Sequence, residues 1–135
     1  MIEPRPSVVR FVNAIVRAEL ARGGSASDSD IALRIMTRLH QQLGKVIGPA
    51  GLDVLLARSL VLARRAHPLL AGITAGPGGA LAGFDDAASD AVALQESALA
   101  IVAHFIELMV VLIGEDLAIR LVHDAWPAVE EDEKK

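Results

Sequence analysis

Two side chains capable of acid–base or metal chemistry stand three residues apart in an otherwise apolar stretch. At that spacing His104 and Glu107 share one face of a helix, so the imidazole and the carboxylate can meet. Di-metal helical bundles place Glu-x-x-His on each of two helices. Here the order is reversed and no second copy exists, which favours a polar contact within the fold or at a subunit interface. We predict no metal ligands and no catalytic residues, and keep this pair as a possible polar site.

Other candidate chemistry is excluded by the neighbouring residues. Pro68 follows His67 and ends a helix, and no lysine stands nearby to hold a phosphoryl group, so His67 is interpreted as a helix terminator. The glycine-rich segment 72–83 lacks the Gly-Lys-Ser/Thr ending of a phosphate-binding loop and predicts a connection without regular structure. With no cysteine, disulfides and thiolate sites are impossible. We predict no cofactor.

Charge and composition limit the partners. The net charge is −4, which argues against nucleic acid as a partner. Residues 1–82 hold ten Lys/Arg and five Asp/Glu, a balance of +5, whereas residues 83–135 hold three and twelve, a balance of −9. Either the charged helix faces are solvated, or the two halves attract within or between subunits. Non-glycine apolar residues make up 53% of the 135 residues, an excess that favours an apolar subunit interface or a bound apolar ligand.

Helical spacing of apolar residues predicts an all-α, compact bundle of about five helices, four long and one short at the C-terminus. No stretch alternates as a half-buried strand does. The helices are expected at about 8–22, 31–47, 49–66, 85–113 and 115–126. The third is apolar nearly all round, which predicts burial on more than one side. The fourth is apolar on every face except one narrow stripe of small and polar residues, so we expect it to be the central helix. Its apolar part, 98–113, is short for a membrane span and contains Glu107, so no span is predicted.

An apolar helix is interrupted twice by Ile-Gly, at Ile47-Gly48 and again 66 residues later at Ile113-Gly114. The helix that begins after each break, called a restart here, ends in a similar way, in His67-Pro68 and in Trp126-Pro127. Aligning the restarts by a one-residue deletion matches Leu52, Val54 and Leu56 with Leu117, Ile119 and Leu121. We interpret the likeness as two helix ends that each turn an apolar helix back onto one core, rather than as a duplicated functional unit.

These patterns predict one helical domain over residues 1–129 and a charged flexible tail over 130–135. The favoured function is a non-catalytic interaction or regulatory module that acts as a homodimer in a reducing, bacterial-type cytoplasm. Such a module could also bind another protein. One alternative is a small apolar-ligand-binding domain with a pocket between the third and fourth helices, anchored by His104 and Glu107. The other is a metal-dependent enzyme that uses the same pair. The predicted interface consists of Leu55, Leu62, Leu108, Met109 and Val111.

Overall fold

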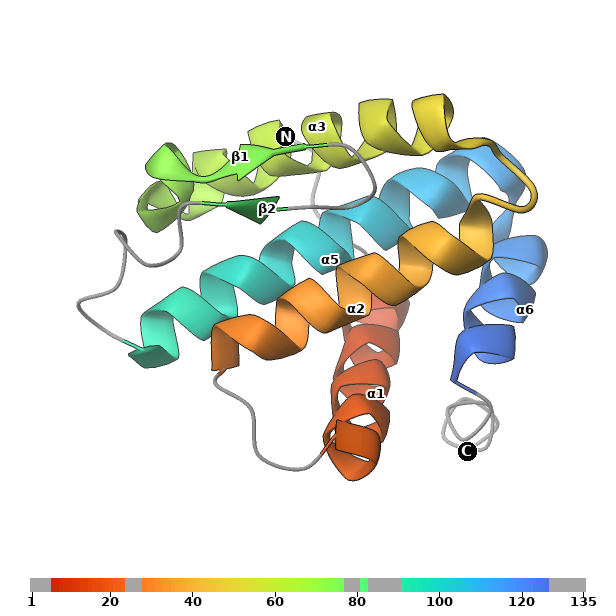
Figure 1. Ribbon diagram of the computed structural model, residues 1–135, viewed down its shortest axis with the longest axis horizontal. Helices are drawn as coiled ribbons and strands as arrows, with labels where there is room; N and C mark the ends of the chain where they lie inside the picture. The colour runs from red at the N-terminus through yellow and green to blue at the C-terminus, as the bar shows by residue number, and fades with distance from the viewer. Residues whose placement is uncertain (1–5, 24–27, 77–80, 83–90, 127–135) are drawn as a thin grey trace.

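The computed structural model of the chain describes residues 6–23, 28–76, 81–82 and 91–126 (Figure 1). Five α-helices make up most of this part and confirm the all-α prediction. They are α1 (Pro6–Gly23), α2 (Asp28–Leu43), α3 (Pro49–Ala66), α5 (Ala91–Ile113) and α6 (Glu115–Ala125), with a 3₁₀ helix, η1 (Pro68–Gly72), after α3. Four are long and the C-terminal one is short, as predicted. The predicted tail and the start of the fourth helix at Asp85 lie outside the described residues.

The 23-residue helix α5 occupies the centre of the molecule. It packs against α1, α2, α3, α6 and η1. Figure 1 shows α2, α3 and α5 lying along the long axis, while α1 and α6 descend across it. Apolar side chains from all five helices meet in one hydrophobic core, in which Phe105, Ile106 and Met109 of α5 are buried. The prediction of α5 as the central helix is therefore confirmed.

The glycine-rich segment has more structure than its composition indicates. After η1, strand β1 (Thr74–Ala75) pairs antiparallel with strand β2 (Leu81–Ala82), with Thr74 opposite Ala82. The Arg64 guanidinium donates hydrogen bonds to the carbonyl oxygens of Leu70 and Ile73, and both of these side chains are buried. The prediction of a connection without regular structure is thus wrong for residues 74–75 and 81–82, because these anchors fix the chain before the first strand.

Helix α2 ends earlier than its apolar pattern predicts. The last helical residue is Leu43, and the carbonyl of Leu43 accepts hydrogen bonds from the amides of Val46 and Ile47 in a tight turn. Val46, which would lie on the apolar face if the helix continued to residue 47, is consequently exposed. A side chain at Gly44 would approach the His40 carbonyl oxygen to 3.0 Å, so the turn is built around this glycine. The helix therefore stops before the Ile-Gly pair, not at it.

Helix α3 is buried on one side only. Its inward positions pack on α5, but Val54 is 68% exposed and Val61 is 38% exposed. The prediction of burial on more than one side is wrong within a single chain, because α3 lies at the edge of the helix layer in Figure 1. An apolar outer face is left without cover from this chain's described residues.

The two Ile-Gly breaks have the same backbone conformation. Gly48 has φ 95° and ψ 146°, and Gly114 has φ 94° and ψ 151°. In each case the glycine carbonyl accepts the first helical hydrogen bond, from Leu52 at 3.1 Å and from Ala118 at 3.0 Å. The structure therefore aligns the restarts without a deletion, and Leu56 takes the same buried position as Val122. The predicted deletion is wrong.

Candidate functional site

A cavity of about 430 Å³ lies between α1, the C-terminal end of α3 and the first half of α5. We call it the His67 cavity. Its volume falls within the range of small-molecule sites in proteins, about 300–1,000 Å³. The lining residues are Val9, Val12, Asn13, Ala66, His67, Glu96, Leu99, Ala100, Ala103 and His104.

The walls of the His67 cavity are apolar and short. Ala66 ends α3, and Ala100 and Ala103 lie one turn apart on α5, where three methyl groups leave space that longer side chains would occupy. Val12 and Leu99 add apolar surface from α1 and α5. Such walls suit an apolar ligand because they release water from apolar surface on both sides when it binds.

Four polar residues meet this apolar space. His67 directly follows α3 and His104 lies on α5, while Asn13 and Glu96 are exposed on α1 and α5. His67 is half-buried, and its Nδ1 lies 3.4 Å from the hydroxyl oxygen of Ser97. A neutral imidazole offers one donor and one acceptor, so the two rings can bind either kind of ligand group.

His104 and Glu107 take different positions relative to the cavity. Both are buried on α5, with 5% and 6% of their surface exposed. His104 lines the His67 cavity, whereas Glu107 does not. No group of three or more His, Cys, Asp or Glu residues that could hold a metal ion occurs within the described ranges. The sequence singled out His104 for the cavity but treated its partner His67 only as a helix terminator.

His67 and Trp126 each follow the last residue of the helix that begins after an Ile-Gly break, α3 and α6 respectively. We call α2 to His67 the first helix-break-helix unit and α5 to Trp126 the second. Because α3 is longer than α6, the two residues are equivalent as helix ends and not by the alignment at the breaks. His67 has φ −132° and ψ 89°, and Trp126 has φ −134° and ψ 80°. Each amide donates to the carbonyl four residues back, of Ala63 at 2.9 Å and of Val122 at 3.0 Å. A proline follows both. The same backbone conformation thus places an imidazole beside a cavity in the first unit and a buried indole in the second.

The indole of Trp126 is buried against a carboxylate from α1. Its Nε1 donates to Glu19 Oε1 at 2.9 Å, and the guanidinium of Arg38 lies 5.8 Å from the ring centroid. Arg34 donates to Glu19 Oε2 from Nε at 3.0 Å and from Nη2 at 2.9 Å, and Arg38 Nε lies 3.4 Å from Oε1. The buried Glu19 therefore joins α1, α2 and the end of α6.

The charge state of Glu19 follows from these contacts. Burial alone raises the pKa of its carboxyl group. The hydrogen bonds from Trp126 and Arg34 and the positive charges of Arg38 and Arg34 lower it by more, so the pKa lies below its ordinary value of 4.5. Sequence analysis missed this network, although Glu19 stands four residues after Ile15 on the apolar face of α1 and so signals a buried carboxylate.

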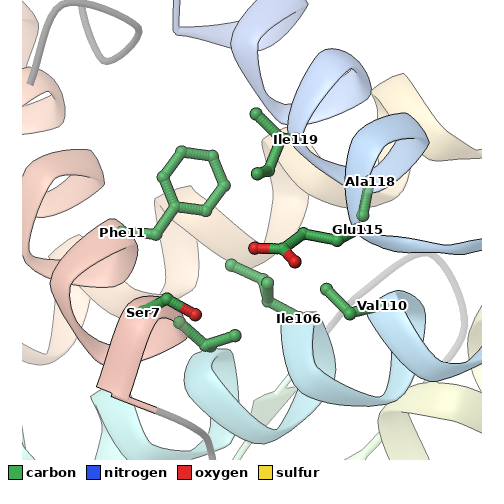
Figure 2. A pocket seen from close by; sticks show the side chains of 8 residues that line it. Ser7, Phe11, Ile106, Val110, Glu115, Ala118 and Ile119 are labelled. Carbon is green, nitrogen blue, oxygen red and sulfur yellow. The ribbon is translucent and has the colours of Figure 1, made fainter. Parts of the chain in front are cut away.

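Two further recesses offer less to a ligand. Figure 2 shows a pocket where Phe11 of α1 and Glu115 of α6 face one another, and its volume of about 20 Å³ has room for about one water molecule. A recess of about 310 Å³ is lined by Glu19, Arg34, Thr37, Arg38 and Gln41. Its two arginines already neutralise the buried carboxylate, so this recess serves the Glu19 network.

One more polar contact connects successive helices. His40 Nε2 lies 3.0 Å from Asp53 Oδ1, which joins the end of α2 to the second turn of α3 across the first break. His40 is buried and Asp53 is partly exposed. This contact fixes the angle of the break and lies away from the His67 cavity.

Within the described part of the chain, one helical window, Glu96–Ile113, is long and apolar enough to cross a membrane by length and composition, with a mean hydropathy of 2.0. In this fold 61% of the window is buried by the chain itself, as in the core helix of a bundle. Position in the cell stays a prediction.

Of the predicted interface residues, Leu62 and Met109 pack inside the chain, Leu55 and Leu108 are half-buried, and Val111 is exposed.

The sequence matches no protein-family model, no curated protein and no solved structure. A function for the chain has therefore to be argued from its own geometry.

Proposed function

We propose that the chain is a non-catalytic, ligand-binding helical domain whose His67 cavity takes a small, mostly apolar molecule. The observation that carries the proposal is the cavity of about 430 Å³, walled by alanines, valines and a leucine, where the equivalent end of the second unit holds a buried tryptophan. This is the ligand-binding alternative from the sequence, with His67 in place of Glu107 as the second polar anchor.

The polar residues define the class of ligand. His104 is almost fully buried, so a ligand group that meets it leaves water and needs a hydrogen bond in return. A hydroxyl, carbonyl or carboxylate group at the histidine end meets this need, because imidazole both donates and accepts. Asn13 and Glu96 are exposed and lie where a ligand can remain in contact with water.

A catalytic role is disfavoured by the position of Ser97, whose hydroxyl lies next to the imidazole of His67. Ser97 lies 3.4 Å from His67 Nδ1, which resembles a serine and its general base. Its hydroxyl is buried, however, and Ser97 is not among the residues that line the cavity. A molecule bound in the His67 cavity therefore contacts the lining residues and not the Ser97 hydroxyl.

The proposal is tested with anilinonaphthalene sulfonate, a fluorescent probe with apolar rings and one anionic group. The wild-type chain should bind one probe molecule per subunit. Ala100→Leu places a longer side chain in the cavity and should raise the Kd at least about tenfold, a loss of about 1.4 kcal/mol. Ala21→Leu, at an exposed position of α1, is the matched control and should bind as the wild type does.

Equal probe affinity in all three proteins would overturn the proposal. Native mass spectrometry of protein purified from its own cells supplies an independent readout, because a retained ligand appears as added mass that Ala100→Leu should lose. Added mass that persists in Ala100→Leu would place the ligand elsewhere.

The predicted homodimeric interaction module stands as a second proposal. Val111 and Leu112 are both largely exposed at the end of the most apolar helix, which supports an apolar contact with another chain. Binding a ligand and forming a dimer are compatible, since they use different surfaces.

A further inference from the structure

The outer face of α3 and the turn before it form a basic surface with apolar centres. Val46 is 54% exposed beside Lys45, and Val54 and Val61 are exposed seven residues apart on one face of the helix. Arg58 lies between the two valines in sequence and is also exposed. We call these five residues the basic strip.

A second exposed surface has the opposite charge. Val111 is 69% exposed and Leu112 is 59% exposed in the last turn of α5. Beyond Gly114, Glu115 and Asp116 open α6 and are both exposed, with Glu115 also lining the small pocket against Phe11. We call Val111, Leu112, Glu115 and Asp116 the acidic corner.

The basic strip and the acidic corner begin at the same end of the molecule. In Figure 1, α3 runs away from its break along the long axis while α5 runs toward its own break, so both breaks lie at the right-hand end. Counted back from the glycine of each break, Lys45-Val46 stand where Val111-Leu112 stand, the first pair in the turn after α2 and the second in the last turn of α5. One end of the chain thus carries both the start of the basic strip and the acidic corner, which have opposite charge.

We propose that a second copy of this chain covers this end, with the basic strip of each copy on the acidic corner of the other. A two-fold axis makes both contacts at once, since in such an interface residue i meets j and j meets i. The contact buries four valines and a leucine from each copy and brings arginine and lysine near carboxylates. Pairing of strip with strip would instead bring Arg58 close to its own copy and is disfavoured.

The apolar content of the chain supports a second copy as the occupant. Apolar residues amount to 53% of the sequence, and the valines of the strip and corner are among the exposed large apolar side chains of the described residues. The N-terminal part is basic and the C-terminal part acidic, so each copy supplies both complementary halves.

The proposed dimer leaves the His67 cavity open. His67 follows the far end of the 18-residue helix α3, roughly 27 Å from its first residue at 1.5 Å per residue. Loss of the dimer therefore need not affect ligand binding, and the two proposals fail independently.

Sedimentation and light scattering give the first test. The wild-type chain should be a dimer, and Leu112→Asp should be a monomer. Ala21→Asp is the control, at an exposed position of α1 outside both surfaces and outside the His67 cavity, and should remain dimeric. Helical circular dichroism with a cooperative melt checks that each variant is folded. A monomeric wild type, a dimeric Leu112→Asp or a monomeric Ala21→Asp would each overturn the proposal.

Charge reversal gives the sharper test. Lys45→Glu with Arg58→Glu makes both surfaces acidic, and Glu115→Lys with Asp116→Lys makes both basic. Each double variant should repel itself and be monomeric at low salt. An equimolar mixture should form a 1:1 heterodimer, because each copy then meets its complement. Adding Leu112→Asp to the second variant should abolish that heterodimer.

Failure of the mixture to associate would overturn the proposed pairing, as would association that survives Leu112→Asp. Added salt should weaken the heterodimer at least tenfold if charge selects the partner, and an association unchanged by salt would contradict that selection.

Discussion

The first helix-break-helix unit, α2 to His67, and the second, α5 to Trp126, share their backbone geometry but differ in what fills their ends. Both breaks place glycine at φ near 95°, and both restarts end in nearly equal dihedral angles before a proline. Trp126 closes the second unit against a buried carboxylate. His67, at the same position, borders a cavity of about 430 Å³. The same backbone conformation thus holds a buried anchoring side chain at Trp126 and a residue that lines a cavity at His67.

The length of the restart accounts for part of this difference. Helix α3 has 18 residues and α6 has 11, so α3 is seven residues, or about two turns, longer. The extra length carries the end of α3 past the centre of α5, toward the early turns where Glu96 and Ala100 lie. Trp126 stops near Glu19 and Arg38 instead.

Of the substitutions that test this difference, we expect the largest loss of stability at Trp126. Trp126→Ala should lower the free energy of unfolding by about 3–5 kcal/mol, because it removes a buried indole and one hydrogen bond to Glu19. His67→Ala, at the equivalent position, should cost less than about 1 kcal/mol, since His67 is half-buried beside a cavity. Urea unfolding of both variants measures the difference. Equal losses would contradict the distinction between anchor and site.

The next effect concerns the carboxylate to which the anchor binds. Glu19→Gln should cost about 2–3 kcal/mol at neutral pH, because the charged acceptor of Arg34 and Trp126 is lost. The pKa of Glu19 is lower in the folded chain than its ordinary 4.5. Its contribution is therefore present above the unfolded pKa and is lost as the pH falls through the folded value.

The free energy of unfolding, measured from pH 7 to pH 3, should show the wild type approaching Glu19→Gln at the acidic end. Glu96→Gln, an exposed carboxylate on α5, is the control and should stay within about 0.5 kcal/mol of wild type. A gap between wild type and Glu19→Gln that widens on acidification would refute the assigned charge state.

The two glycines sharpen the claim that the breaks are equivalent. Gly48→Ala and Gly114→Ala should each cost about 1–3 kcal/mol, because their φ and ψ are accessible almost only to glycine. No atom lies within 4 Å of a Cβ added at either position, so the cost is backbone strain alone and should be equal. Gly72→Ala also meets open space but without a positive φ, and should be close to neutral. Chemical denaturation compares all three, and unequal costs at the breaks would undo the equivalence.

Local signals in the sequence predict the helices and most of their ends. Glycine and proline mark where they stop, and α3 was predicted with its observed ends, Pro49 and Ala66. The end of α2 was misplaced because Val46 and Ile47 continue its apolar spacing, while the turn depends on Gly44 and its approach to a carbonyl.

Long-range contacts could not be read from local pattern. Glu19 and Trp126 are 107 residues apart, and His67 and Ser97 are 30 apart. The cavity exists because short side chains from three helices converge, and no single helix signals that convergence. A polar residue on an apolar helix is conspicuous, so the sequence indicates His104, whereas the proline after His67 is enough to account for that residue as a helix end.

The most direct test of the central claim exchanges the equivalent residues in one direction. His67→Trp gives the first unit the residue that fills the second, and binding of anilinonaphthalene sulfonate is then measured against wild type. We expect a folded protein whose Kd for the probe rises at least about tenfold, with Ala21→Leu unchanged. A His67→Trp protein that binds the probe as tightly as wild type would contradict the assignment of the cavity as the site.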